Sequence, residues 1–212
     1  MIDSHKIDYS KLETLNVSRE TFLELDEFKE MILYENKKIN LISQHTEEIA
    51  RDRHIIDCAQ IIDLIDKNHL SCTDLGSGSG LPGLVLAIIK KKQKSDMKFF
   101  LYEKSFKKSN FLKKVINKFE LNAEVINQNI FDQKNLSSDL IVARAFKPLP
   151  IILDLVTTNF ANFKDIILFL GKSGKSSIEQ CLKKWNLEFI EKKSLTEKDS
   201  VLVKINKVRK KI

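Results

Sequence analysis

Glycine is concentrated in one segment of the chain. Four of the six glycines in 212 residues fall in Thr73-Asp74-Leu75-Gly76-Ser77-Gly78-Ser79-Gly80-Leu81-Pro82-Gly83. Glycine lets a backbone turn tightly and lets a ligand approach the main chain closely. The segment follows a short apolar stretch and precedes the apolar run Leu84–Ile89, so it predicts a strand, a loop and a helix that begins near Pro82. Free N–H groups at such a helix start can cradle polar or anionic parts of a cofactor.

The spacing of these glycines fits two kinds of cofactor. Residues 78–83 read Gly-x-Gly-x-x-Gly, the fingerprint of dinucleotide-binding proteins, whereas residues 74–80 read Asp-x-Gly-x-Gly-x-Gly, as in methyltransferases that use S-adenosylmethionine (SAM). Glu103 could accept hydrogen bonds from a ribose hydroxyl in either case. Asp74 favours SAM, because a buried carboxylate would repel a pyrophosphate but can hold the amino group of SAM. A NAD-dependent oxidoreductase remains the first alternative.

Arg144 is the next candidate, because it directly follows the four apolar residues 140–143 and therefore emerges at the carboxyl end of a predicted strand. Ligands of parallel sheets bind outside the carboxyl ends of the strands. The same rule selects Glu103 and the segments 127–132 and 144–148. A structural alternative for Arg144 is an ion pair with Glu103 or Asp139.

Two further segments carry cationic groups. Arg51-Asp52-Arg53-His54-Ile55-Ile56-Asp57-Cys58 can contact phosphate, and the alternative is a solvated helical face with an internal ion pair. Gly171-Lys172-Ser173-Gly174-Lys175-Ser176 resembles a phosphate loop, but Phe169 stands where a Walker loop needs its first glycine, which excludes an NTP site. This segment is either a basic loop that touches RNA phosphates or a solvated turn.

The elements that position these residues follow from the apolar periodicity. Residues 1 to about 65 lack Gly and Pro and are predicted to be helical, with Ser18 as a helix N-cap and a second helix from about Thr46 to Asp66 whose residues Ile49, Ile56, Ile61 and Ile65 point inward. Strands and helices alternate afterwards. We predict strands at 72–75, 98–102, 123–126, 140–143, 166–170, 187–190 and 201–205, and helices that include 111–119, 150–160 and 176–185.

This alternation predicts an α/β fold with a mostly parallel sheet, helices on both faces and antiparallel strands at one edge. We expect residues 1–65 to form a helical N-terminal extension packed on a Rossmann-like domain of residues 66–212.

The composition favours a polyanionic partner. The chain carries 36 basic and 29 acidic residues, a formal net charge of +7, although a compositional bias of the genome is an equally good explanation. The helix around residues 107–118 has a lysine-rich face. The three cysteines lie far apart, so neither a zinc site nor any other metal site is expected. We found no targeting or membrane-spanning segment and expect a monomeric cytoplasmic protein without membrane contact.

Four motifs together resemble one family. They are Asn40-Leu41-Ile42, Arg53-His54-Ile55-Ile56-Asp57-Cys58, the glycine segment with its Leu81-Pro82-Gly83 ending, and Arg144-Ala145-Phe146. Their order and spacing resemble the bacterial 16S ribosomal RNA guanine-N7 methyltransferases, also called the glucose-inhibited division protein B family. The resemblance implies a class I SAM-dependent methyltransferase fold that acts on the small ribosomal subunit. The expected product is N7-methylguanine at nucleotide 527 of 16S rRNA, in the 530 loop.

The resemblance also implies site residues. It maps SAM contacts onto Gly76, Leu81, Ile130, Phe131 and Arg144, with Glu103 as the ribose-binding acid; the glycine spacing adds Asp74, Gly78 and Gly80. Our hypothesis is that Arg144 positions the cofactor or the base, that Phe146 stacks near the base, and that Arg53, His54 and Lys147 meet RNA phosphates. The second alternative is a non-catalytic RNA-binding factor, in which the basic helix would be the main feature.

Overall fold

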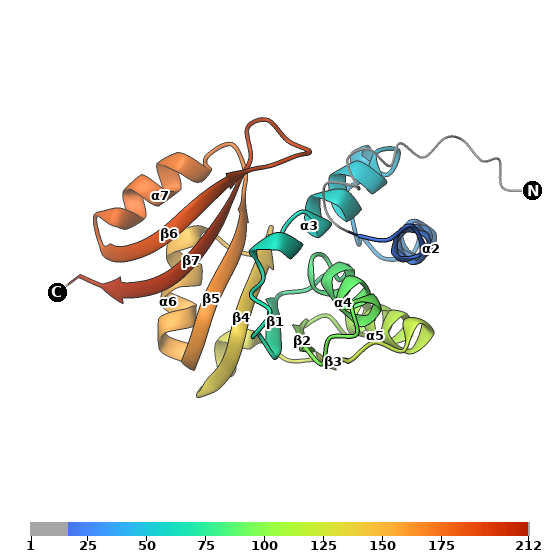
Figure 1. The fold of residues 1–212 in the computed structure, drawn as a ribbon, viewed down its shortest axis with the longest axis horizontal. Coiled ribbons are helices and arrows are strands. Elements are labelled where there is room, and N and C mark those ends of the chain that lie inside the picture. Colours follow the sequence, from blue (N-terminus) through green and yellow to red (C-terminus); the bar gives the residue numbers. More distant parts are fainter. Residues whose placement is uncertain (1–16, 212) are drawn as a thin grey trace, which may run out of the picture.

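The computed structural model describes residues 17–211 as a seven-stranded sheet in the order β3-β2-β1-β4-β5-β7-β6 (Figure 1). The strands are β1 (Ser71–Leu75), β2 (Lys98–Tyr102), β3 (Ala123–Ile126), β4 (Leu136–Arg144), β5 (Phe160–Leu170), β6 (Trp185–Lys193) and β7 (Val201–Lys210). The first five strands pair in parallel, and β7 is antiparallel to both of its neighbours. The mostly parallel α/β sheet with an antiparallel edge is thereby confirmed.

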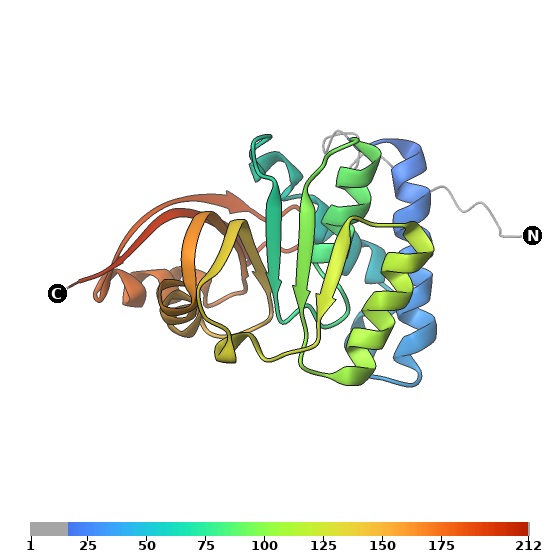
Figure 2. The same ribbon diagram turned by 90° about the horizontal axis from the view of Figure 1, so that it is seen from below.

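Helices cover both faces of the sheet. The helices on one side are α2 (Arg19–Asn36), α4 (Gly83–Lys92) and α5 (Phe106–Phe119); those on the other are α6 (Leu149–Asn159) and α7 (Gly174–Leu182) (Figures 1 and 2). Each side has its own apolar cluster, because successive strand residues point to opposite faces: Val142 packs with the α4 side, and Ile141 and Ala143 pack with the α6 side.

The chain reverses its direction across the sheet beside β1. It runs from β1 outward to β3 and then returns to the opposite side of β1 as β4, so the carboxyl ends of β1 and β4 frame the switch point. Ligand sites of doubly wound sheets lie at this place. The loops that follow β1, β2, β3 and β4 all reach this edge.

Helix α2 shares the core of the sheet. Ser18 caps α2 as predicted, with its Oγ accepting from the Thr21 amide at 3.3 Å, and α2 buries Leu25, Phe28 and Ile32 in the same cluster as α4 and the sheet. The division of the chain at residue 65 into an extension and a domain stays a prediction. Within residues 17–211, no helix is long and apolar enough to cross a bilayer.

The predicted helix from Thr46 to Asp66 is wrong as a single element. The structure has a 3-10 turn η1 (Gln44–Thr46), a π-helical segment η2 (Arg51–Ile56), one turn of α-helix α3 (Asp57–Ala59) and a 3-10 turn η3 (Ile62–Leu64). Ile49, predicted to be buried, is exposed. Side chains from distant elements bind carbonyl groups of this segment: Arg144 donates to the Arg53 oxygen and Lys192 to the Gln60 oxygen. These hydrogen bonds from distant side chains bind carbonyl groups in a segment whose helical hydrogen-bond pattern is irregular.

Several strands and helices have other limits than predicted. β4, β5, β6 and β7 are longer than the apolar runs that indicated them, because their added residues are mostly polar and lie at the ends of the strands. A further 3-10 turn, η4 (Ile130–Asp132), follows β3. The predicted strands β2 and β3 match residue by residue.

Candidate functional site

The glycine loop begins at Asp74, near the carboxyl end of β1. Asp74 is 1% exposed, and its Oδ2 accepts the backbone N–H of Gly83, the first residue of α4, at 3.1 Å. A Cβ on Gly83 would lie 2.6 Å from this oxygen, so only glycine permits the helix to start this close to the carboxylate. The Gly83 end of the loop is therefore hydrogen-bonded to β1 through Asp74.

Asp74 has one carboxylate oxygen with no partner. Its Oδ1 is buried and accepts no hydrogen bond from the described residues. Burial, with a smaller contribution from the negative charge of Glu103, raises the pKa of Asp74 to about 7 against the opposing effects of the Gly83 amide and the nearby Ser77 hydroxyl. A buried acceptor without a donor costs about 1–3 kcal/mol. A cationic amino group of a ligand would satisfy this oxygen and would favour the ionised carboxylate.

Glu103 lies on the other side of the loop, immediately after β2. Its Oε2 accepts the Gly78 amide at 2.9 Å and its Oε1 accepts the Ser105 amide at 2.7 Å. Glu103 is 8% exposed. Two carboxylates from neighbouring strands therefore flank the glycine loop, and their oxygens are acceptors for hydroxyl and ammonium donors.

An aromatic pair covers the loop. Gly76 has φ +67°, and a Cβ there would lie 2.3 Å from the ring of Phe146, so glycine is required both by the backbone and by this contact. The Phe146 ring stacks on Phe131 with a centroid distance of 5.9 Å. The Asn159 side chain of α6 donates to the carbonyl oxygens of Ile130 and Phe131 and fixes the turn that carries Phe131.

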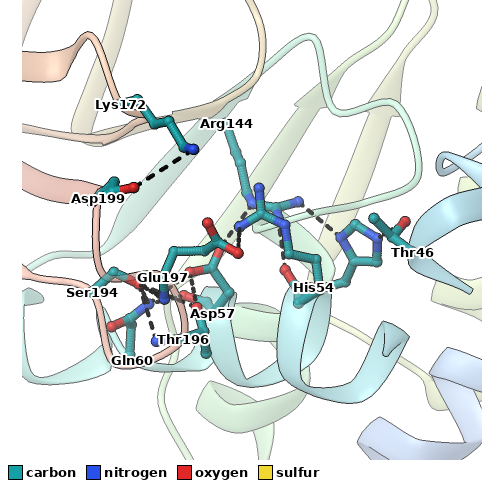
Figure 3. A network of polar contacts seen from close by, with 11 residues as sticks. Thr46, His54, Asp57, Gln60, Arg144, Lys172, Ser194, Thr196, Glu197 and Asp199 are labelled. Carbon is teal, nitrogen blue, oxygen red and sulfur yellow. Dashed lines mark hydrogen bonds and ion pairs between the residues drawn. The ribbon is translucent and has the colours of Figure 1, made fainter. Parts of the chain in front are cut away.

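Arg144 is held by the irregular N-terminal segment (Figure 3). Its Nε donates to Asp57 Oδ2 at 3.0 Å, one terminal nitrogen donates to the Arg53 carbonyl at 2.7 Å, and the other lies 3.2 Å from His54 Nδ1. Neither Glu103 nor Asp139, the predicted partners, pairs with Arg144; Asp139 pairs with Lys164 instead. A guanidinium has five N–H groups, so within residues 17–211 two remain for a ligand.

His54 is buried between Arg144 and Thr46. Burial, together with the charges of Arg144 and Arg53, lowers the pKa of His54 to about 4. The imidazole is therefore neutral near pH 7. It accepts from Arg144 at Nδ1 and donates from Nε2 to Thr46 Oγ1 at 2.8 Å, a tautomer assigned from this network. Thr46 in turn donates to the Ser43 carbonyl at 2.7 Å.

Asp57 joins Arg144 to the loop between β6 and β7. Its Oδ1 accepts the Thr196 hydroxyl at 2.7 Å and the Gln60 side-chain amide at 2.8 Å, and Gln60 Oε1 accepts the Leu195 amide at 2.8 Å. Figure 3 shows Thr196 and Gln60 on one side of Asp57 and Arg144 on the other. The interpretation of segment 51–58 as a solvated helical face is wrong, because His54 and Asp57 are buried.

Two pockets open beside Arg144. One, of about 350 Å³, is lined by Arg53, His54, Asp57 and Arg144 on one wall and by Gly171 and Ser200 on another. The second, of about 320 Å³, holds Phe146 and Lys147. Both are lined by Ala145 and residues 169–171, so they adjoin each other.

The structure thus gathers the predicted site residues at one edge of the sheet, in two groups. The first group surrounds the glycine loop and comprises Asp74, Gly76, Gly78, Gly80, Leu81, Glu103, Ile130 and Phe131; the second lines the two pockets and comprises Arg53, His54, Arg144, Phe146 and Lys147. Phe146 belongs to both, since it touches Gly76 and lines a pocket.

Asp57 belongs to the motif of residues 53–58 but was assigned no role in the site, and Thr46 and Thr196 were not recognised from the sequence. Besides that motif, the sequence signal for Asp57 is its position three residues after His54, a spacing that places both on one helical face. No cluster of three or more potential metal ligands occurs among residues 17–211.

Comparisons with known proteins agree with one another. The family described as rRNA small subunit methyltransferase G matches residues 22–205. Ribosomal RNA small subunit methyltransferase G of Pelagibacter ubique (strain HTCC1062) is 50% identical over 206 residues, which cover 96% of this chain and 97% of the relative.

Solved structures show the same fold at low identity. The 16S rRNA methylase RmtB has a TM-score of 0.55 and 12% identity, with 93% of this chain and 80% of that chain covered. A SAM-dependent methyltransferase from Aquifex aeolicus has a TM-score of 0.55 and 13% identity, with 74% of this chain and 91% of that chain covered. The predicted class I, Rossmann-like methyltransferase fold is confirmed.

Proposed function

The chain belongs to the rRNA small subunit methyltransferase G family, and we propose that it transfers a methyl group from SAM to N7 of a guanine in 16S rRNA. The methylated nucleotide would be 527, in the 530 loop. The observation that carries the SAM assignment is the glycine loop flanked by Asp74 and Glu103, with Asp74 Oδ1 buried and unpartnered.

The residues around the loop suit the parts of SAM. Asp74 would accept from its amino group and Glu103 from its ribose hydroxyls, in exchange for the Gly78 or Ser105 amide that Glu103 now binds. Gly76, Gly80 and Leu81 would lie against it. Ile130 and Phe131 would border it on the side of β3, and the free donors of Arg144 would reach it or the base. When bound, SAM supplies an electrophilic methyl group to an attacking lone pair.

Guanine N7 carries an available lone pair at neutral pH, so this reaction needs no general base. The protein has to hold the reacting atoms in line and exclude water, and such positioning can contribute up to about 7–11 kcal/mol. The site fits this requirement, because Arg144 is fixed by three hydrogen bonds and His54 is held neutral by burial.

The pockets beside Arg144 suit the RNA. Phe146 presents an aromatic ring beside the glycine loop, and RNA-binding proteins commonly stack unpaired bases on such rings. Arg53 and Lys147 line the two pockets and would meet phosphates. A direct contact of His54 with phosphate stays a prediction. Both nitrogens of His54 already bind Thr46 and Arg144, so the contact would require one of these hydrogen bonds to be exchanged.

The proposal is tested by incubating the protein with methyl-labelled SAM and small-subunit particles that lack the modification, and then mapping the labelled nucleotide. We expect label at N7 of a single guanine in the 530 loop. Titrations with SAM and NAD complete the test: NAD binding without SAM binding would favour an oxidoreductase, and RNA binding without transfer would favour a non-catalytic RNA-binding factor.

A further inference from the structure

A third hollow lies along the carboxyl edge of the sheet, beyond the two pockets beside Arg144. It has a volume of about 580 Å³ and is bounded by the loop between β5 and α7 and by the end of the β6–β7 hairpin. Four lysines line it, two from each side: Lys172, Lys175, Lys193 and Lys198. We call this hollow the lysine groove.

The charge of the lysine groove is largely uncompensated. Two carboxylates, Glu191 and Asp199, also line it, so the lining carries two more positive than negative charges. The Lys172–Asp199 pair at 3.6 Å is weak, because the two side chains are 82% and 64% exposed. The other three lysines form no ion pair with any residue of the described range.

The basic face of α5, by contrast, is partly neutralised within the molecule. Lys118 lies 2.9 Å from Glu27 and Lys114 lies 3.9 Å from Glu35, and both carboxylates belong to α2. Two of the five lysines among residues 107–118 therefore lie near acidic residues of the same chain. The lysine groove is the better candidate for an external anion.

The lysine groove is continuous with the candidate site. Ser200 and Val201 line both the groove and the 350 Å³ pocket that holds Arg53 and Arg144. That pocket adjoins the one that holds Phe146 and Lys147. A chain of cationic side chains therefore runs along one edge of the sheet, from the aromatic pair that covers the glycine loop to the tip of the hairpin.

One wall of the groove is fixed to the site. The hairpin loop is bound to Asp57 through the Thr196 hydroxyl and to Gln60 through the Leu195 amide, and Lys192 bonds Asp63 at 2.6 Å. Asp57 also holds Arg144. The lysines of the hairpin are thus kept at a set distance from the pocket, as a surface that binds a segment continuous with the substrate base requires.

We propose that the lysine groove binds the sugar-phosphate backbone of the substrate RNA beside the guanine that enters the site. This inference rests on the proposed function. Lysine ammonium groups bind phosphates as point charges without reading sequence, so the groove would supply affinity and register, while the pockets near Phe146 would select the base.

The test replaces Lys172, Lys175, Lys193 and Lys198 together by glutamine and measures affinity for unmodified small-subunit rRNA at several salt concentrations. Each phosphate contact contributes about 0.7 to the slope of log K against log salt for single-stranded RNA, so loss of four contacts should reduce the slope by about 3. A matched variant carries Gln at Lys67, Lys94, Lys183 and Lys184, which are exposed at the opposite edge of the sheet.

The matched variant is expected to lower the slope by less than about 1. All eight lysines are exposed, so both variants should keep the thermal unfolding midpoint of the wild type. Equal slopes for the two variants would contradict RNA binding by the lysine groove. If the wild-type protein still binds and methylates the RNA, the proposed function stays intact. Wild-type protein that transfers no methyl group would instead overturn the proposed function.

Discussion

At the scale of single residues, the buried pair of Asp57 and Arg144 dominates the site. Sequence patterns placed Arg144 at the ligand edge correctly, because four apolar residues before a charge mark the end of a buried strand. They could not find its partner, since Asp57 is 87 positions away and local periodicity carries no information about such contacts. Asp74 and Glu103 were also recognised from the sequence. The hydrogen bonds that they accept from the amides of Gly83 and Gly78 were not, because local patterns carry no information about such contacts.

The pair gives a first prediction for stability. Asp57→Asn leaves the Arg144 charge in a site where its side chain is 13% exposed, and an unpaired buried charge costs about 3–5 kcal/mol. Urea unfolding measures this loss. Asp63→Asn is the matched control, because Asp63 pairs with Lys192 at the surface and its removal should cost no more than about 1 kcal/mol. Similar losses for both variants would show that Arg144 does not depend on Asp57.

At the scale of elements, the segment from Gln44 to Leu64 shows where periodicity failed. Its apolar spacing predicted one regular helix, but the structure bends it through η1, η2, α3 and η3. The parallel strands β1, β4 and β5 were easier to predict, since their central residues are buried on both faces and read as apolar runs. Glycine and proline marked the loop after β1 for the same local reason, whereas contacts formed across the fold decide the path of the irregular segment.

The loop between β6 and β7 gives an element-scale prediction. Thr196→Val removes the hydroxyl that donates to Asp57, and hydrogen bonds to charged groups contribute about 1.5–3 kcal/mol. Amide hydrogen exchange of residues 194–200 should become at least about tenfold faster, the factor that 1.4 kcal/mol represents in local opening. Thr157→Val serves as the control, because its hydroxyl bonds only carbonyls of α6. Unchanged exchange in Thr196→Val would show that other contacts hold the loop.

At the scale of the whole molecule, two buried groups act oppositely on the pH dependence of stability. Asp74 has its pKa raised to about 7, so the folded state holds more protons than the unfolded state between about pH 4 and pH 7, and stability falls as the pH rises. His54 has its pKa lowered to about 4, so its contribution is present above about pH 6.5 and is lost as the pH falls.

Asp74→Asn separates the two contributions. Relative to the wild type, the variant should gain stability as the pH rises from about 4 to about 7, by roughly 2–4 kcal/mol. Urea unfolding of both proteins across this range measures the difference. A free-energy difference that stays constant with pH would contradict the proposed protonation of Asp74 in the folded protein.

The connection of Asp57 to the hairpin loop also affects when the site can form. Asp57 and Gln60 lie in the first third of the chain, whereas their partners Thr196 and Leu195 are separated from them by 139 and 135 positions. During synthesis, the glycine loop and the first five strands can assemble while the ribosome still holds the last two. Arg144 is then present, but the loop that completes the Asp57 network is not. The Asp57 network is therefore complete only when the β6–β7 hairpin has joined the sheet through the pairing of β7 with β5.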